Sequence, residues 1–230
     1  MTILALETAT ATCGVALWHE GRVQAEAHVH QPRVHAQRLT PLVEAVLEQA
    51  GCARRAVDVV AVSEGPGSYT GLRIGVSTAL GWAEALDVPV LGVSTLEALA
   101  ASATPYVPPG ARLVGALDAR RDDVYAAAYA WDGTALTLQR EPTACAAAAV
   151  AEWIDEASPT WMIGPGAAKC AAASAHGVTE VLPAASWVAR RAAHHLGAGA
   201  TPVARTAFEP FYLKAFHGTP APSPLARLDS

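Results

Sequence analysis

The chain has 230 residues, of which 52% are hydrophobic and 16% are charged. This balance excludes a disordered chain and indicates one or two compact domains with a substantial core. The formal net charge of −5 argues against a protein that binds nucleic acid by itself, because phosphate neutralisation supplies most of that affinity. Glu7 interrupts the N-terminus too early for a signal peptide, and no apolar run approaches the roughly 20 residues of a membrane helix. We therefore expect a cytoplasmic protein that does not contact a membrane.

The first half of the chain is expected to contain three strands and a helix, followed by alternating strands and helices. Short apolar or alternating runs predict strands at residues 3–6, 13–18, 22–30, 57–62 and 88–93. The spacing of apolar residues predicts helices over 35–50, 70–86 and 95–102, and Gly51 ends the first of these. The order is βββαβαβα.

The same order starts again after residues 104–110, which three prolines and a glycine mark as a linker. Strands are predicted at 113–117, 124–131, 136–139, 161–163 and 178–182, with helices at 144–155, after Gly164-Pro165-Gly166, and at 186–196. Two βββαβαβα halves predict an internal duplication with a cleft between them. The expected division is a first domain over 1–107, a second over 108–217 and a disordered tail over 218–230, where proline and serine are frequent.

The organising stretch is SEGPGSYTGLRIG at residues 63–75. It follows a buried strand, and Gly65-Pro66-Gly67 makes a tight turn before the second helix. Ser68 or Thr70 can cap that helix. Gly71, Gly75 and Ala79 are spaced four apart and line one face, which predicts a surface where a partner helix approaches closely; the alternative is that this face covers the protein's own sheet.

The first turn of a duplicated α/β fold of the actin/hexokinase/Hsp70 type normally holds an acidic residue near nucleotide phosphates. Glu7 and Thr8 occupy that place and are candidate remnants of a nucleotide loop, although a capped turn that binds nothing has the same pattern. The second half lacks the glycine-rich phosphate loops that a phosphotransferase of this fold needs. We assign no catalytic residue on these patterns.

A metal site is not predicted. His35 is followed at i+4 by Leu39, so that helix offers no second histidine on the same face, and His194 and His195 point apart on a helix. The four cysteines are far apart and are expected to be free, buried thiols of a reducing compartment.

Several segments resemble the bacterial TsaB (YeaZ) family. The most specific is GPGSYTGLRIG at 65–75; ILALETAT at 3–10, GVSTLEALA at 92–100, Asp118-Ala119-Arg120 and PFYLK at 210–214 also match. The matches span residues 3–214, and Glu7 stands where the family usually has aspartate. The resemblance implies the duplicated actin/hexokinase/Hsp70-like (ASKHA) α/β fold.

The resemblance also implies a role. Members are non-catalytic scaffold subunits that form a heterodimer with the transferase TsaD, which installs threonylcarbamoyl on adenosine 37 of tRNAs that read ANN codons. TsaD carries an HxxxH metal motif, and Leu39 replaces its second histidine here. The ATPase TsaE is a further partner, tRNA is bound only through the complex, and the chain forms a homodimer when alone. No cofactor of its own is implied, and ATP or ADP is bound, if at all, in the assembled complex.

In the family, the first two helices of the N-terminal half pack against the matching helices of TsaD. Carried onto this sequence, the interface residues are Leu39, Leu42, Val43, Val46, Gly71, Ile74, Gly75, Thr78, Ala79 and Trp82. Two other functions are weighed against this one. The first is a kinase or ATPase of the ASKHA superfamily acting alone through Glu7; the second is a metallopeptidase-like enzyme.

Overall fold

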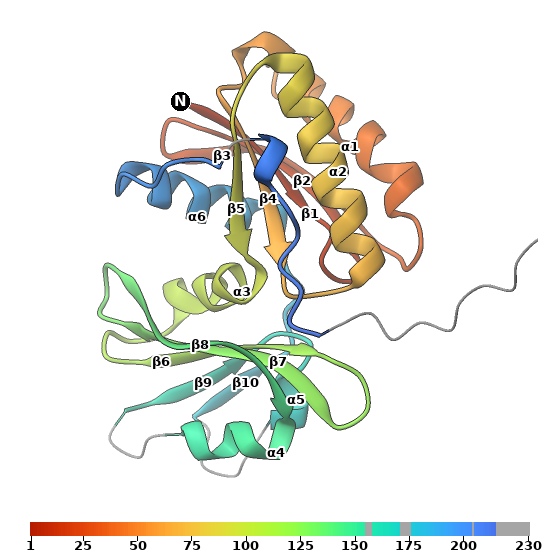
Figure 1. The fold of residues 1–230 in the computed structure, drawn as a ribbon. Coiled ribbons are helices and arrows are strands. Elements are labelled where there is room, and N and C mark those ends of the chain that lie inside the picture. The colour runs from red at the N-terminus through yellow and green to blue at the C-terminus, as the bar shows by residue number, and fades with distance from the viewer. Residues whose placement is uncertain (155–157, 171–175, 204, 215–230) are drawn as a thin grey trace, which may run out of the picture.

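A computed structural model describes residues 1–154, 158–170, 176–203 and 205–214. Two five-stranded sheets form two lobes, one above the other, and the chain passes from the first lobe to the second between α3 and β6 (Figure 1). Each lobe is built from one half of the sequence, with exceptions at the C-terminal end.

The sheet of the N-terminal lobe has the order β3-β2-β1-β4-β5. Its strands are β1 (Thr2–Glu7), β2 (Thr12–His19), β3 (Arg22–His30), β4 (Val59–Gly65) and β5 (Val90–Ser94). β1 pairs with β2 antiparallel and with β4 parallel, and all six of its residues are buried. A strand buried on both faces has a continuous apolar sequence, which is why residues 3–6 do not alternate.

Helices cover both faces of this sheet. α1 (His35–Gln49) and α2 (Tyr69–Leu86) lie on one face, and α3 (Thr95–Ala103) and α6 (Ala185–Gly197) lie on the other (Figure 1). Since side chains alternate along a strand, Leu4 and Leu6 of β1 pack under α1 and α2, whereas Ile3 and Ala5 pack under α3 and α6.

The sheet of the C-terminal lobe has the order β10-β9-β6-β7-β8. Its strands are β6 (Arg112–Asp118), β7 (Asp123–Trp131), β8 (Leu136–Ala146), β9 (Thr160–Ile163) and β10 (Gly177–Thr179). Leu96 and Leu99 of α3 pack against one face. The short helices α4 (Ala147–Val150) and α5 (Ala167–Cys170) cover the other, so α3 lies between the two sheets (Figure 1).

The predicted helix over 144–155 is wrong at its start. β8 continues to Ala146, and its residues 144 and 145 pair with Tyr125 and Val124 of β7. Only Ala147–Val150 is α-helical, followed by a 3-10 turn at Ala151–Trp153. Alanine favours helix, but backbone pairing with a buried neighbouring strand overrides that weak preference. For the same reason the strand predicted over 136–139 is longer than expected. The strand predicted over 178–182 is Gly177–Thr179, the three residues that pair with β9.

Both halves have the order βββαβαβα, and the molecule has the duplicated ASKHA α/β fold. The expected boundary after residue 107 separates the two sheets, but the second half does not stay in its own lobe. α6 packs on the first sheet, and Phe208 joins the core beneath α1 and α2. The tail expected over 218–230 lies outside the described residues. No helix in the described part of the chain is long and apolar enough to cross a membrane.

A buried ion pair joins α3 to α6 at the contact between the lobes. The Arg191 guanidinium donates to Glu97 Oε1 from Nη2 at 2.6 Å and from Nε at 3.0 Å, and His195 Nε2 lies 2.9 Å from the same oxygen. Burial alone raises the pKa of Glu97, but the hydrogen bond with His195 and the charge of Arg191 outweigh it and hold that pKa below its usual value. The pair fixes α6, from the second half, against the last helix of the first half.

Candidate functional site

The turn between β1 and β2 lies directly beneath the first two turns of α2. The backbone N–H of Ser68 donates to the carbonyl oxygen of Ala9 at 2.7 Å, and the N–H of Thr8 donates to Ser63 Oγ at 3.4 Å. Ser68 caps α2 by accepting from the N–H of Gly71 at 3.3 Å, as predicted. The organising stretch therefore holds the first turn of the chain in place.

Glu7 is fully buried at this turn. Its Oε1 accepts a 2.6 Å hydrogen bond from the N–H of Ala9, whereas its Oε2 and the Thr8 hydroxyl have no hydrogen-bond partner among the described residues. Burial raises the pKa of Glu7 to about 7, even though the Ala9 N–H and the Ser63 hydroxyl lower it. Glu7 is thus a carboxyl with an unsatisfied oxygen inside the N-terminal lobe.

The side chains of the Glu7 turn are closed off from solvent in the isolated chain. Glu7 and Thr8 are both 0% exposed, so neither presents a surface to a phosphate from solution. A cavity beside α6 and a smaller one beside Tyr129 are lined by other residues. This burial argues against an ATPase that acts through an exposed Glu7, and the role of Glu7 and Thr8 as the remnant of a nucleotide loop stays a prediction.

The small residues of α2 face inward, which contradicts the predicted partner-facing stripe. Gly71, Gly75 and Ala79 are buried against the chain's own turn and sheet. A β-carbon at Gly71 would overlap the Thr8 carbonyl oxygen, and one at Gly75 would overlap the Thr8 hydroxyl. These glycines allow the β1–β2 turn to approach the helix, so the closely approaching backbone belongs to this chain.

Three of the predicted contacts on α1 fail for the same reason. Leu39, Val43 and Val46 are at most 1% exposed and form the core beneath the two helices. A partner cannot reach them. The remaining predicted residues are partly exposed at the edge of this core and stay a prediction: Leu42, Ile74, Thr78 and Trp82.

A second stripe of small residues on α2 does face outward. Ser77, Gly81 and Ala85 are exposed and again spaced four apart, and a β-carbon at Gly81 would meet no atom within 4 Å. Ile74, Thr78 and Trp82 flank this stripe. We name these six residues the α2 outer face. Both stripes have the same four-residue spacing in the sequence, and only the packing of α2 on the sheet shows which of them is exposed to solvent.

The sequence motif at 210–214 connects the two lobes. The N–H of Phe211 donates to the Glu64 carbonyl oxygen at 2.7 Å, and the Tyr212 ring stacks on Tyr69 of α2 with centroids 4.7 Å apart. Lys214 then donates to Asp123 Oδ2 at 2.6 Å in the other lobe. The sequence indicated only a family match for this segment and gave no sign that it joins the lobes.

The histidines of the described residues belong to no group of three potential metal ligands. Among the described residues no three histidine, cysteine, aspartate or glutamate side chains lie close enough to hold an ion. His35 is buried, with Nε2 3.0 Å from the Thr12 carbonyl oxygen, and Leu39 one turn later lies in the core. The four cysteines are free thiols, although Cys52 and Cys145 are only half-buried.

Comparison with known proteins identifies the family of this chain. A family model described as TsaD, tRNA N6-adenosine threonylcarbamoyltransferase, matches residues 25–187. The solved structure titled YeaZ from Pseudomonas aeruginosa is 35% identical, with a TM-score of 0.83 over 92% of this chain and 99% of that one. The chain belongs to the TsaB (YeaZ) family.

Curated relatives of the TsaB family carry a functional name. The tRNA threonylcarbamoyladenosine biosynthesis protein TsaB of Escherichia coli (strain K12) is 43% identical over 133 residues, or 57% of this chain and 56% of the relative. The protein of the same name from Bacillus subtilis (strain 168) is 40% identical over 129 residues, or 56% of this chain and 55% of the relative. The chain thus spans about half the length of the curated relatives it matches.

The two stripes on α2 predict opposite effects of the same substitution. Gly75→Ala should destabilise the fold by about 1–3 kcal/mol, because the methyl group overlaps the Thr8 hydroxyl and forces the turn to move. Gly81→Ala should instead stabilise it by up to about 1 kcal/mol, because helix propensity improves and nothing is displaced. Urea denaturation of both variants measures the difference. Equal effects would mean that the inner and outer faces are wrongly assigned.

Replacing Glu7 by Gln is expected to remove a pH-dependent loss of stability. The folded chain holds this proton with a pKa of about 7, against a reference value of 4.5, so the wild-type free energy of unfolding falls as pH rises through that interval. A shift of this size corresponds to about 3 kcal/mol. Glu7→Gln should lack this fall and become the more stable protein above pH 7.

Urea denaturation at about pH 5 and about pH 8 tests this expectation. Glu48→Gln is the control, because that side chain is exposed on α1 and its replacement should leave the pH dependence of the wild type intact. A wild type and a Glu7→Gln variant with parallel pH profiles would show that Glu7 ionises normally in the folded chain.

Proposed function

We propose that this chain is a non-catalytic subunit of tRNA threonylcarbamoyladenosine biosynthesis, which forms a heterodimer with the TsaD transferase. The transferase then modifies adenosine 37 of tRNAs that read ANN codons. Membership of the TsaB family, whose curated relatives are named for this biosynthesis, supports the process. The observation that carries the scaffold role is the α2 outer face, which this chain leaves exposed next to a fully packed core.

The residues that would perform chemistry in this fold are engaged internally. His35 is held by the Thr12 carbonyl oxygen, and Glu7 is sealed beneath α2. Both arrangements support a subunit that positions another enzyme rather than a kinase or a metallopeptidase. In the proposed complex, ATP or ADP is bound, if at all, after the subunits have assembled.

The α2 outer face suits a partner helix. Ser77, Gly81 and Ala85 have little or no side chain to separate two backbones, and Ile74 and Trp82 offer apolar area beside them. Leu42 of α1, which packs against the same core, extends this surface. A stable complex would bury about 800 Å² of surface on each partner, with an apolar centre.

The proposal includes the other partners expected of the family. The same surface forms a homodimer when TsaD is absent, the ATPase TsaE joins the heterodimer, and tRNA is held through the complex in the cytoplasm. The net charge of −5 supports an indirect contact with tRNA, since a net anionic chain gains little affinity from neutralising the many phosphates of a tRNA backbone.

Gly81→Leu is expected to break the heterodimer without harming the fold. The leucine side chain extends into solvent in the isolated chain, where a β-carbon meets nothing within 4 Å, but it would hold a partner helix away. The dissociation constant for TsaD should rise at least roughly tenfold. Light scattering of the mixture, with tRNA threonylcarbamoylation assayed on the same samples, measures both binding and function.

Gly197→Leu is the matched control, because Gly197 is also exposed, also helical and also free of neighbours within 4 Å, but it lies on α6. It should bind and support modification like the wild type. A folded Gly81→Leu protein that still forms the complex would place the interface elsewhere. Modification by the wild-type chain alone would overturn the scaffold role itself.

A further inference from the structure

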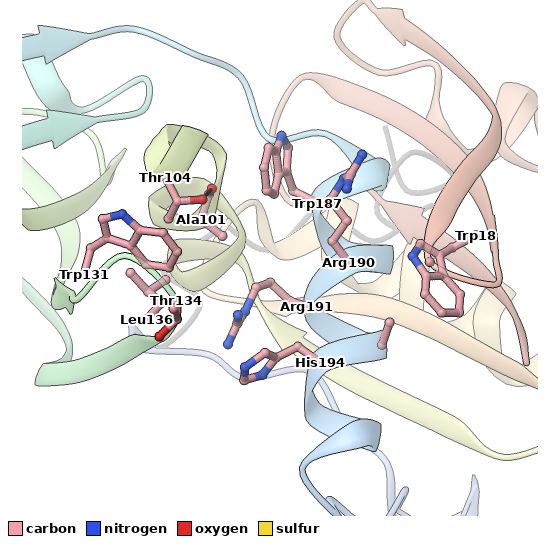
Figure 2. Close-up of a pocket in the computed structure, with 12 residues that line it drawn as sticks. Trp18, Ala101, Thr104, Trp131, Thr134, Leu136, Trp187, Arg190, Arg191 and His194 are labelled. Carbon is pink, nitrogen blue, oxygen red and sulfur yellow. Dashed lines mark hydrogen bonds between the residues drawn. The ribbon is translucent and has the colours of Figure 1, made fainter. Parts of the chain in front are cut away.

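A cavity of about 300 Å³ lies between the two lobes on the side of α3 and α6. Three tryptophans line it: Trp18 from β2, Trp131 from β7 and Trp187 from α6. Figure 2 shows Trp131 on one side of the space, Trp18 on the other, and Trp187 with the basic residues of α6 between them. Three indoles around one cavity account for half of the six tryptophans in the chain.

The cavity is a product of the duplication. Trp18 stands near the end of β2, the second strand of the first half, and Trp131 stands at the end of β7, the second strand of the second half. α3 and α6 are likewise the last helices of the two halves. The cavity is far from the Glu7 turn. Trp18 lies at the end of β2 that pairs with the start of β1, where Thr2 is opposite His19, whereas Glu7 lies at the other end of β1.

The charge of the cavity is carried by one exposed cation. None of the described residues that line it is acidic. Arg191 is committed to Glu97, and burial, together with the charges of Arg191 and His195, lowers the pKa of His194. Arg190 has no ion pair with a described residue, and its guanidinium lies over the Trp187 ring, 5.3 Å from the centroid.

We propose that this cavity binds a nucleotide, with the base against the indole of Trp131 or Trp187 and the phosphate paired with Arg190. Aromatic rings stack on bases of any sequence, and arginine pairs with phosphate through two parallel hydrogen bonds. The volume is at the lower end of the range of small-molecule sites and suits one base with its phosphate. The ligand is a free mononucleotide or one unstacked nucleotide of an RNA strand.

The experiment follows the indole signals of the six tryptophans by NMR while ligand is added to the full chain. The probes are AMP, a short single-stranded oligoadenylate, adenosine and inorganic phosphate. AMP or the oligoadenylate should shift the signals of Trp18, Trp131 and Trp187 and leave those of Trp82, Trp153 and Trp161 in place. Adenosine and phosphate should each bind roughly tenfold more weakly than AMP, because adenosine lacks the phosphate that pairs with Arg190 and inorganic phosphate lacks the base.

Arg190→Glu should weaken binding of the active probe roughly tenfold, and Arg190→Lys should retain more of it. Arg140→Glu is the matched control, since Arg140 is exposed and its guanidinium also lies over an indole, that of Trp153, outside the cavity. It should change the affinity by less than about twofold.

Shifts with AMP identify a free nucleotide as the ligand, and shifts with the oligoadenylate alone identify an RNA strand; both support the proposal. It is overturned if neither probe moves these three signals, or if Arg190→Glu binds as well as Arg140→Glu. The inference does not rest on the proposed heterodimer. Loss of nucleotide binding in a variant that still associates with TsaD would separate the two.

Discussion

The arrangement of the N-terminal lobe depends on one close approach, that of Thr8 to the first two turns of α2. The backbone and hydroxyl of Thr8 occupy the space that side chains at positions 71 and 75 would need. Glycine at both positions lets the helix lie directly on the turn, at the entropic cost that glycine carries in a helix. This contact fixes the rotation of α2 about its axis, and with it the choice of residues that face outward.

The same constraint recurs in the second half. The N–H of Gly166 donates to the Ala116 carbonyl oxygen at 3.0 Å, as that of Ser68 does to Ala9, and a β-carbon at Gly166 would crowd Leu117. In both halves the Gly-Pro-Gly turn opens a helix, α2 in the first half and α5 in the second. The duplicated halves thus share the close approach of a strand end to this turn.

The order of the elements could be predicted from the sequence because each depends on local periodicity and on glycine and proline punctuation. The inward face of α2 could not, because two stripes with the same spacing coexist on that helix and the choice depends on Thr8, more than sixty residues earlier. Burial of Glu7 has the same origin, since its cover comes from distant segments. The links made by Tyr212 and Lys214, and the cavity built from Trp18, Trp131 and Trp187, bring together residues from opposite ends of the chain. Side-chain type alone gave no signal for them.

The inner face of α2 packs on the chain's own turn and sheet, and in the proposed complex its outer face contacts the partner. Cross-saturation from unlabelled TsaD to a deuterated, nitrogen-labelled sample of this chain tests that division residue by residue. Saturation transfer to the amides of Ser77, Gly81 and Ala85, with far less at Gly71 and Gly75, is the predicted result. A complex in which saturation falls on α3 and α6 instead, or a mixture in which no complex forms, would contradict it.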